Sequence, residues 1–418
     1  MSDVLSPLNS HPIEACQICN GRNLRSAVFL GYVPPVNTML PVGSTPDAEL
    51  RFPLEMLRCD DCTLVQIGYE VDPRILFPHS YPYLSGTTRI LRDNFRDLAH
   101  QCRDLFGIGA DDLVIDVGAN DGTLLTPFRE IGCKVLGIEP SQAADVATGR
   151  GIAMMKDYFS RDAARRAVEQ YGRARIVTAA NVFAHIPDPH GIVEAIKSML
   201  VPGGVFVNES HYLLDLIQTL QYDTVYHEHL RYYSLGSLER LFAAHDLEVF
   251  RVKRIPTHGG SIRVFAAAPG TYPVDASVQE CRDEERRFGL DTADALADFR
   301  RRVMQSKLDL LALLADLKRG GQRVFGVGAP SRASTLVTYV GLDDSLLDCV
   351  VEVSNSHKLD KFMPGTRIPV LDEEKLYREQ PEYALLLSWH IAEELGANLR
   401  KRGYRGKFIV PLPEPRVF

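Results

Sequence analysis

The sequence predicts an α/β protein in which a small cysteine-organised N-terminal domain precedes two Rossmann-like domains with parallel sheets. Two observations support this prediction. Two Cys-x-x-Cys pairs lie near the N-terminus, and each of two later regions has an apolar run, a glycine turn and a helix start. We place the first domain in residues 1–75, the second in residues 76–270 and the third in residues 271–418.

The composition is that of a folded globular chain. Of the 418 residues, 45% are hydrophobic and 24% are charged, which excludes long disorder, collagen and coiled coils. The formal net charge of −7 argues against a protein that coats nucleic acid. No apolar run approaches the about 20 residues of a membrane span, and the N-terminus lacks the features of a signal peptide. We therefore expect a cytoplasmic protein without membrane association.

Four of the eight cysteines form the two Cys-x-x-Cys pairs: Cys16 with Cys19, and Cys59 with Cys62. Four thiolates close a tetrahedral zinc shell and leave no open position for water, so we expect a structural zinc site. The alternatives are a redox dithiol or a chance pair of cysteines, which a single Cys-x-x-Cys pair would leave open. The segment 32–37 between the pairs is Pro-rich, which predicts a domain with little regular structure.

The second domain is predicted from a strand, a turn and a second strand. Residues 113–117 (LVIDV) are typical of a buried parallel strand, and the glycine turn 118–122 (GANDG) follows directly. The next strand, 135–138, ends at Glu139. An acid at that position binds a ribose diol in Rossmann-like folds, so we expect a nucleoside at this edge of the sheet.

The glycine turn does not match a dinucleotide site, because Asn120 replaces the second glycine and the acids Asp116 and Asp121 flank the turn. Two acids suit the cationic S-adenosylmethionine (SAM) better than a pyrophosphate. The segment resembles the first motif of class I SAM-dependent methyltransferases, and segments 156–159, 176–185 and 200–207 resemble later motifs. The alternative is a doubly wound domain without a cofactor. The residues expected to bind SAM are Asp116, Gly118, Asn120, Asp121, Gly122, Glu139, Asp157, Tyr158 and Asn181.

A run of histidines and tyrosines, residues 222–234, follows the predicted methyltransferase strands. His227 and His229 are two residues apart, so they do not share one helix face as metal ligands on a helix would. We expect acid–base chemistry instead, because a histidine beside a carboxylate and phenols can have its tautomer fixed and its pKa tuned. A loop with solvated or core histidines is the alternative.

The chain is similar, over nearly its whole length, to the sugar C-methyltransferases. The resemblance rests on the cysteine pairs, the SAM motifs, Tyr-His-Glu-His at 226–229 and His-Gly-Gly-Ser at 258–261. Members of this family are three-domain enzymes that methylate C3 of nucleotide-linked 4-keto-6-deoxy sugars. The catalytic residues that the resemblance implies are His229 as the base, Glu228 as the adjacent acid, Tyr226 as the leading phenol, and Tyr81 or Tyr83 near the substrate.

The third domain is predicted from residues 323–332, where a strand leads into a turn with Gly326 and Gly328. Without a third glycine we do not expect NAD. The resemblance implies instead that this domain holds the nucleotide diphosphate of the sugar. Residues 278–318 are expected to form connecting helices. The residues expected at the substrate are His227, His258, Ser261, Arg332 and Lys358.

Two departures from the family concern the third domain. Residues 332–334 are Arg-Ala-Ser where the family has Lys-Gly-Asn, and 353–361 has less Pro and Gly. The carrier, dTDP or GDP, therefore stays open. The alternatives are an O- or N-methyltransferase on a sugar or small metabolite, and a non-catalytic zinc-bearing protein with a decayed methyltransferase fold. We expect a monomer, because one chain supplies both domains that form the cleft.

Overall fold

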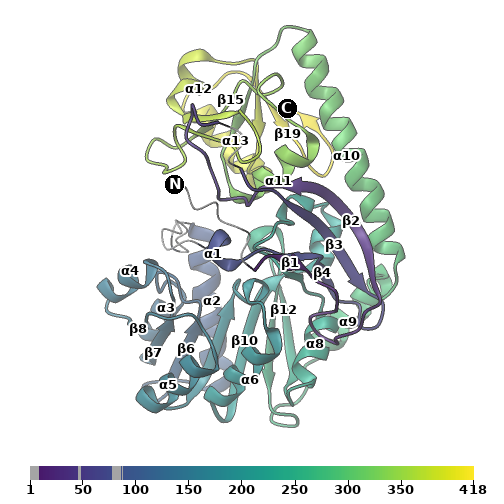
Figure 1. Ribbon diagram of the computed structural model, residues 1–418. Helices are drawn as coiled ribbons and strands as arrows, with labels where there is room; N and C mark the ends of the chain where they lie inside the picture. Colours follow the sequence, from purple (N-terminus) through teal and green to yellow (C-terminus); the bar gives the residue numbers. More distant parts are fainter. Residues whose placement is uncertain (1–8, 46–48, 78–85, 87) are drawn as a thin grey trace, which may run out of the picture.

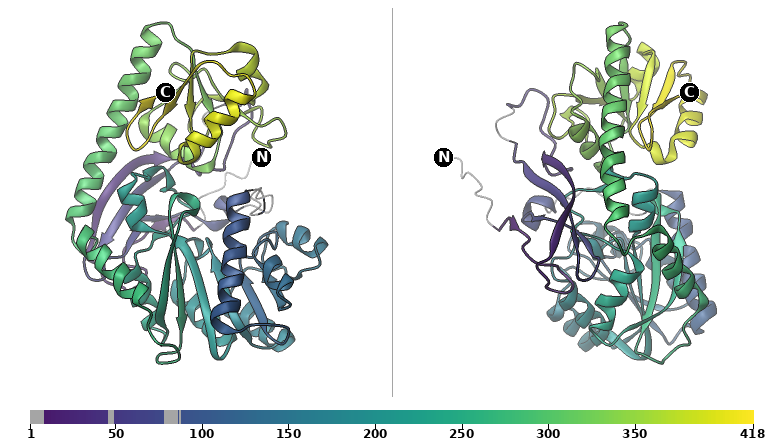
Figure 2. Two further views of the ribbon diagram at one scale, coloured as in Figure 1. Left: turned by 180° about the vertical axis from the view of Figure 1, so that it is seen from behind. Right: turned by 90° about the vertical axis from the view of Figure 1, so that its right-hand side faces the viewer.

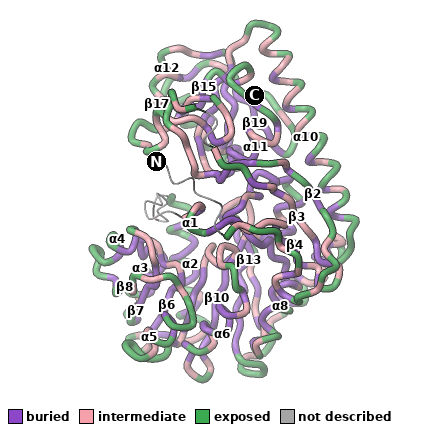
Figure 3. Tube along the Cα trace, in the orientation of Figure 1, coloured by how far each residue is buried: buried purple, intermediate pink, exposed green. Residues whose placement is uncertain are grey.

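The computed structural model describes residues 9–45, 49–77, 86 and 88–418. Three main sheets organise these residues: one of four strands and two of seven. In Figure 1 the two larger sheets lie in the lower and upper parts of the molecule, and the N-terminal strands lie between them. The most buried segments follow the inner strands, and exposed residues follow the outer helices (Figure 3).

The N-terminal sheet has the order β11-β4-β3-β2, and all its strands are antiparallel. The prediction of little regular structure here was wrong. The segment LRSAVFLGYV of the longest strand is rich in apolar and aromatic residues, and it pairs along most of its length with the next strand. The strands are β2 (Leu24–Val33), β3 (Phe52–Cys59), β4 (Val65–Ile67) and β11 (Arg231–Tyr232).

The middle sheet has the order β12-β13-β10-β9-β6-β7-β8. Strand β13 is antiparallel to both neighbours, whereas β10, β9, β6, β7 and β8 are parallel. Their carboxyl ends therefore meet at one edge, where a ligand binds in open α/β sheets. The strands are β6 (Leu113–Val117), β7 (Lys134–Ile138), β8 (Ala153–Met155), β9 (Ala174–Ala180), β10 (Leu200–His211), β12 (Glu248–Ile255) and β13 (Ser261–Ala267).

Helices and three short helical turns accompany the strands of this sheet. Helix α2 contacts α3, and α5 contacts α6. The helices and turns are α2 (Arg89–Phe106), α3 (Leu125–Glu130), α4 (Ala143–Gly149), α5 (Arg161–Tyr171), η3 (Phe183–His185), α6 (Pro189–Met199), α7 (Leu213–Gln218), η4 (Tyr222–Thr224), α8 (Leu235–Ala243) and η5 (Thr257–Gly259).

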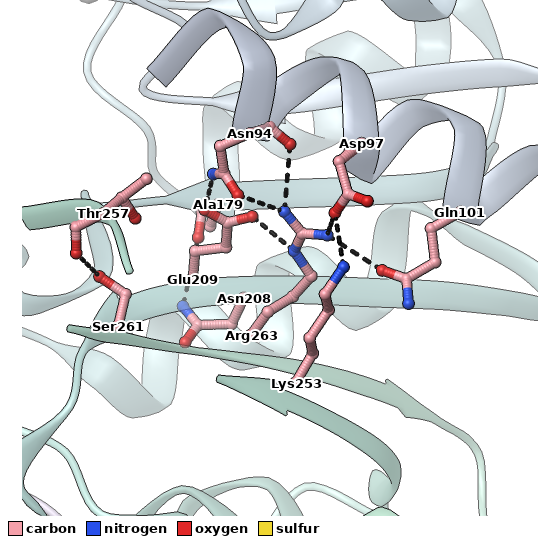
Figure 4. A network of polar contacts seen from close by, with 10 residues as sticks. All are labelled: Asn94, Asp97, Gln101, Ala179, Asn208, Glu209, Lys253, Thr257, Ser261 and Arg263. Carbon is pink, nitrogen blue, oxygen red and sulfur yellow. Dashed lines mark hydrogen bonds and ion pairs between the residues drawn. The ribbon is translucent and has the colours of Figure 1, made fainter. Parts of the chain in front are cut away.

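A buried ion network fixes α2 against the sheet (Figure 4). Arg263 on β13 is fully buried and donates to Glu209 on β10 at 2.6 Å. The same guanidinium donates to Asn94 on α2 at 2.9 Å and to Asp97 at 3.0 Å. Asn94 in turn donates to Glu209 at 2.9 Å. A buried charge is costly unless it is paired and hydrogen-bonded. Because Arg263 and Glu209 are paired in this way, the network stabilises the contact of α2 with β10 and β13.

The C-terminal sheet has the order β16-β17-β15-β14-β18-β19-β20, with β17, β15, β14, β18 and β19 parallel. This confirms the second Rossmann-like domain. Its strands are β14 (Val324–Val327), β15 (Cys349–Glu352), β16 (Lys361–Phe362), β17 (Pro369–Asp372), β18 (Tyr383–Leu386), β19 (Lys407–Val410) and β20 (Arg416–Val417), and its helices include α11 (Ser331–Val340), α12 (Glu374–Glu379) and α13 (Ala392–Lys401).

Two helices, α9 (Ala276–Phe288) and α10 (Asp294–Arg319), connect the two seven-stranded sheets, as predicted. Figure 2 shows α10 running along the outside of the molecule, and it contacts both β2 and α11. The N-terminal segment also reaches the C-terminal domain, because Phe362 donates its backbone N–H to Leu40 at 2.8 Å. Within the described ranges, no helix has the length and apolar character needed to cross a membrane.

Candidate active site

The four cysteines of the two pairs converge as predicted. The Sγ atoms of Cys16, Cys19, Cys59 and Cys62 all lie within 4.8 Å of one another, with 3.3 Å between Cys16 and Cys62. Zinc–sulfur bonds of about 2.3 Å in a tetrahedron place the sulfurs about 3.8 Å apart, so the cluster fits Zn²⁺. With four thiolates as ligands, the site is closed, and zinc stabilises this domain without taking part in chemistry.

The zinc-binding turn is tied to the middle domain through Arg231. This buried side chain donates to the side chain of Gln17 at 2.9 Å and to the backbone of Phe183 in η3 at 3.2 Å. Its strand, β11, directly follows the Tyr-His-Glu-His run and pairs with β4. The zinc-binding domain therefore positions the segment that carries His229.

The glycine turn after β6 has the geometry for a close ligand. Gly118 has φ +70°, and a Cβ there would lie 2.6 Å from Val182, so only glycine fits. Glu139, at the end of β7, accepts backbone N–H bonds from Asn120 at 3.0 Å and Ser141 at 2.9 Å. Its carboxylate keeps further lone pairs for a ribose diol. These residues fit SAM, whose reactive methyl group is bonded to a cationic sulfonium sulfur.

The two acids of this turn differ in environment. Asp116 is buried, and its pKa is raised to about 8, first by burial and then by the charges of Glu139 and Glu209. The hydroxyl of Thr178 donates to it at 2.6 Å. Asp121 instead accepts from Thr123 in its own turn at 2.6 Å, so its carboxylate shapes the loop.

Four further residues were expected at SAM. Asn181 follows β9, has φ +58°, and donates its backbone N–H to the backbone carbonyl of Glu209 at 2.8 Å. Asp157 forms an ion pair with Arg166 of α5. The side chain of Tyr158 is on the surface, with 58% of the residue exposed. Gly122 has φ +74° and packs against Ile152.

Four histidines meet at the carboxyl edge of the middle sheet. The ring of His229 lies 5.0 Å from that of His185 and 5.3 Å from that of His211. His211 lies 6.0 Å from His258. Tyr226 packs against His229 with ring centroids 4.2 Å apart. The structure thus brings His229, Tyr226 and His258 together, as the sequence predicts, and adds two histidines.

The four rings are held neutral. The pKa of His229 is lowered to about 3, first by burial and then by His185, and that of His258 to about 4 by burial and by Arg332. Burial also lowers the pKa values of His185 and His211. Nδ1 of His229 lies 2.9 Å from the carbonyl of Thr224, so Nδ1 carries the proton. Nε2 of His229 therefore presents a lone pair, as a general base must.

Glu228 connects the histidine run to the other two domains. Asn37 from the N-terminal domain donates to its carboxylate at 2.7 Å, and Ser331 at the start of α11 donates to Asn37 at 2.9 Å. Lys358 of the C-terminal domain has its pKa lowered by burial and raised in part by the charges of Glu352 and Glu228. Its Nζ donates to the carbonyl of Ala329 at 2.5 Å. Contacts from all three domains thus meet near Glu228.

Arg332, expected at the substrate, forms a buried pair between the domains. Its Nε and Nη2 donate to both carboxylate oxygens of Asp223 in η4, at 2.7 and 2.8 Å. The indole of Trp389 donates to the same carboxylate at 2.7 Å, and the guanidinium lies 4.9 Å from the ring centroid. Nη1 has no hydrogen bond to the residues that the structure describes, so it is the nitrogen left to meet a ligand.

Two residues expected at the substrate lie in structural contacts instead. His227 points away from the four rings, to the carbonyl of Pro53 at 3.1 Å and the ring of Phe52 at 5.9 Å. Ser261 is buried and donates to the carbonyl of Thr257 at 3.1 Å (Figure 4). Tyr81 and Tyr83 lie outside the described residues.

No role was assigned from the sequence to five residues of this site: His185, His211, Asp223, Trp389 and Asn37. A signal existed for the first two, because His211 ends β10 and His185 follows β9, and both strand ends face the SAM turn. Asp223 lies within the histidine run. Nothing local marks Trp389 or Asn37, since their partners are far away in the sequence.

Known sequence families match all three parts of the chain. A zinc-binding domain family matches residues 16–77, a methyltransferase domain family matches residues 90–252, and a family described as the C-methyltransferase C-terminal domain matches residues 256–413. Together these matches span the N-terminal, middle and C-terminal sheets described above.

Among known proteins, C-methyltransferase NovU of Streptomyces niveus is 34% identical over 409 residues, which is 97% of both chains. The ubiquinone biosynthesis O-methyltransferase of Acinetobacter baumannii is 34% identical over 96 residues, 22% of this chain and 40% of the other.

Among solved structures, the glycopeptide N-methyltransferase MtfA in complex with S-adenosylmethionine covers 46% of this chain and 99% of its own, with 14% identity and a TM-score of 0.34. The NovU match and the three family matches agree with the zinc cluster, the glycine turn and the two Rossmann-like sheets. The chain therefore belongs to the C-methyltransferase family of NovU, and it is a SAM-dependent methyltransferase with a structural zinc-binding domain.

Proposed function

We propose that this enzyme methylates C3 of a nucleotide-linked 4-keto-6-deoxy sugar, in the biosynthesis of a branched deoxysugar. The observation that carries the proposal is the lone pair on Nε2 of His229. It belongs to a neutral ring whose Nδ1 proton is held by Thr224, at the same sheet edge as the SAM turn. Methylation at carbon needs such a base, because a carbon acid must first lose its proton.

The ketone makes the neighbouring carbon acidic. In the proposed reaction, Nε2 of His229 takes the proton from C3. The C3–H electron pair then forms the carbon–carbon double bond of the enolate, and the carbonyl π pair moves to the ketone oxygen. Donors such as Tyr226 or a neighbouring imidazole stabilise that oxygen in a site where burial strengthens each hydrogen bond. Glu228 and Asn37 hold the segment that carries the base. SAM supplies the electrophilic methyl group.

The C-terminal domain is the proposed binding site of the nucleotide diphosphate. Lys358 and Nη1 of Arg332 lie on this side and carry positive charge for phosphates, and the turn after Gly328 offers backbone N–H groups. Gly328 has φ +81°, which orients that turn. The carrier, dTDP or GDP, a monomeric state and a cytoplasmic location belong to the same proposal.

The test combines mass spectrometry with solvent exchange. Purified enzyme is incubated with SAM and a panel of dTDP- and GDP-linked 4-keto-6-deoxy sugars, and a gain of one methyl group on one sugar nucleotide is expected. In D₂O without SAM, the same sugar should gain deuterium at C3. Methylation of a hydroxyl or amine without exchange at C3 would show an O- or N-methyltransferase instead.

The base is tested with His229→Asn. We expect turnover to fall at least ~100-fold, the usual scale of general-base catalysis, because the amide cannot take up the proton. Affinity for SAM, measured by calorimetry, should stay unchanged. His100→Asn on the exposed face of α2 is the matched control. Turnover of His229→Asn near that of the control would remove His229 from this role.

A further inference from the structure

His258 has a backbone conformation that is uncommon for a residue other than glycine. It lies in η5, between β12 and β13, with φ 57° and ψ 21°, the left-handed region. The next two residues, Gly259 and Gly260, are glycines that adopt positive φ without this cost. Strained non-glycine residues persist where the surrounding structure imposes them, and they gather at active sites.

The turn around His258 is held on several sides. The side chain of Gln221 donates to the carbonyl of Gly259 at 2.6 Å, and Gly260 donates its N–H to Thr257 at 3.0 Å. A Cβ at Gly259 would lie 2.2 Å from Gln221. These contacts fix the turn, so the position of the imidazole is set by the fold and not by its own preference.

Nε2 of His258 is buried and has no hydrogen-bond partner within the described part of the chain. A buried polar nitrogen without a partner is costly, and such atoms in native proteins call for an explanation such as a ligand. The ring faces His211 at 6.0 Å, and His211 faces His229 at 5.3 Å. The unpartnered nitrogen therefore belongs to the same group of rings as the base.

The surroundings keep this imidazole uncharged. Burial of the ring nitrogen disfavours the charged form, and the guanidinium of Arg332 opposes a second positive charge there. A neutral imidazole carries one N–H and one lone pair, so it can act as a hydrogen-bond donor without giving up its proton. Neutral histidines serve in this way toward substrate carbonyls in other enzymes.

We propose that Nε2–H of His258 is the donor to the ketone oxygen of the substrate, on the opposite side of the reacting carbons from His229. This inference rests on the proposed function. When the C3–H bond breaks, the proton passes to Nε2 of His229, the C3–H electron pair forms the carbon–carbon double bond, and the carbonyl π pair moves to oxygen. His258 stabilises that oxygen, and its own N–H bond stays intact.

Two substitutions separate a donor from a base. His258→Asn suits the left-handed conformation, but its amide is too short to reach the position of Nε2. His258→Gln places an amide N–H near that position. The measured quantity is the rate of C3 deuterium uptake in D₂O by the sugar nucleotides of the panel, with no SAM present. His229→Gln and His100→Gln are measured beside them, and thermal unfolding checks that each variant is folded.

We expect uptake by His258→Asn to be at least ~100-fold slower than in the unchanged enzyme, the scale seen when an oxyanion donor is removed. His258→Gln should stay within about 10-fold of the unchanged enzyme, because its N–H restores the donor. His229→Gln should stay as slow as His229→Asn, since an amide cannot act as the base. His100→Gln should not change the rate.

Uptake by His258→Asn within about twofold of the unchanged enzyme would overturn this inference, and so would His258→Gln as slow as His258→Asn. Both results leave the proposed function standing, because the unchanged enzyme still exchanges C3. Absence of uptake by the unchanged enzyme with every sugar of the panel would overturn the proposed function and this inference with it.

Discussion

The pair of Arg332 and Asp223 shows how single residues hold the two Rossmann-like domains together. Both groups are buried, and both carboxylate oxygens are used. Trp389 adds a third donor and a ring face under the guanidinium. A planar guanidinium can make these contacts at once, whereas an ammonium cannot. This geometry gives a physical role to the arginine that replaces the lysine of the family pattern.

Breaking this pair should cost far more than breaking an exposed one. We expect Asp223→Asn to lower the free energy of unfolding by about 3–5 kcal/mol, because Arg332 is left buried without its counter-charge. Asp298→Asn removes the partner of Arg301 on exposed α10 and should cost less than about 1 kcal/mol. Urea denaturation measures both values. A loss for Asp223→Asn no larger than that of the control would contradict the assignment.

At the scale of elements, the turn between β6 and α3 combines a left-handed backbone with a close neighbour. Gly118 has φ +70° and Val182 beside it, whereas Gly107, which ends α2 with φ +63°, has open space around its Cβ position. Both glycines carry the same backbone requirement. Only Gly118 also lies close to a neighbouring side chain, that of Val182. Alanine substitution at both positions therefore separates the effect of the positive φ from the effect of the close contact.

We expect Gly107→Ala to lower the free energy of unfolding by about 1 kcal/mol with no effect on SAM binding. Gly118→Ala should weaken SAM binding at least ~10-fold, since Val182 must shift within the turn that holds the cofactor. Calorimetric titration with SAM measures the affinity. Equal affinities of the two variants would show that the contact with Val182 does not shape the site.

The sequence predicts elements whose signal is local. The strand at 113–117 is a continuous apolar run, and the two Cys-x-x-Cys turns carry their own spacing, so both were predicted correctly. Strand β2 was not predicted, because the two prolines that directly follow it are typical of irregular structure and the whole segment was interpreted in that way. His227 and His229 look alike in sequence, yet His227 turns to Pro53 and His229 to the site. The order of strands, which brings His211 beside His229, is not a local property.

At the scale of the whole molecule, buried histidines make stability depend on pH. The pKa of His229 is lowered to about 3, and those of His227 and His258 to about 4. These histidines take up protons near pH 6.5 in the unfolded chain but not in the folded protein. Their contribution to the free energy of unfolding is therefore fully present above that pH and is lost as the pH falls. Asp116, Asp215 and Glu285 have raised pKa values and act in the opposite direction. Among the described residues, eight histidines have lowered pKa values, so the histidines outnumber these three carboxyls.

We therefore expect the free energy of unfolding to fall between pH 7 and pH 5, by about 2 kcal/mol for each such histidine. Urea denaturation at several pH values measures this. His227→Gln removes one of these groups, so its profile should be shallower by about 2 kcal/mol over the same range. His100→Gln, at an exposed position, should keep the full slope. A flat profile for the unchanged enzyme would show that these imidazoles take up protons within the native state.

Strand β11 also has a consequence for the order in which the protein is made. The first domain in the sequence needs residues 231 and 232 to complete its sheet. Its cysteines leave the ribosome early, but the strand that closes the sheet beside β4 is synthesised only after most of the middle domain. The N-terminal domain is therefore finished together with the middle domain and not before it, and a fragment that stops at residue 75 would present an unpaired sheet edge.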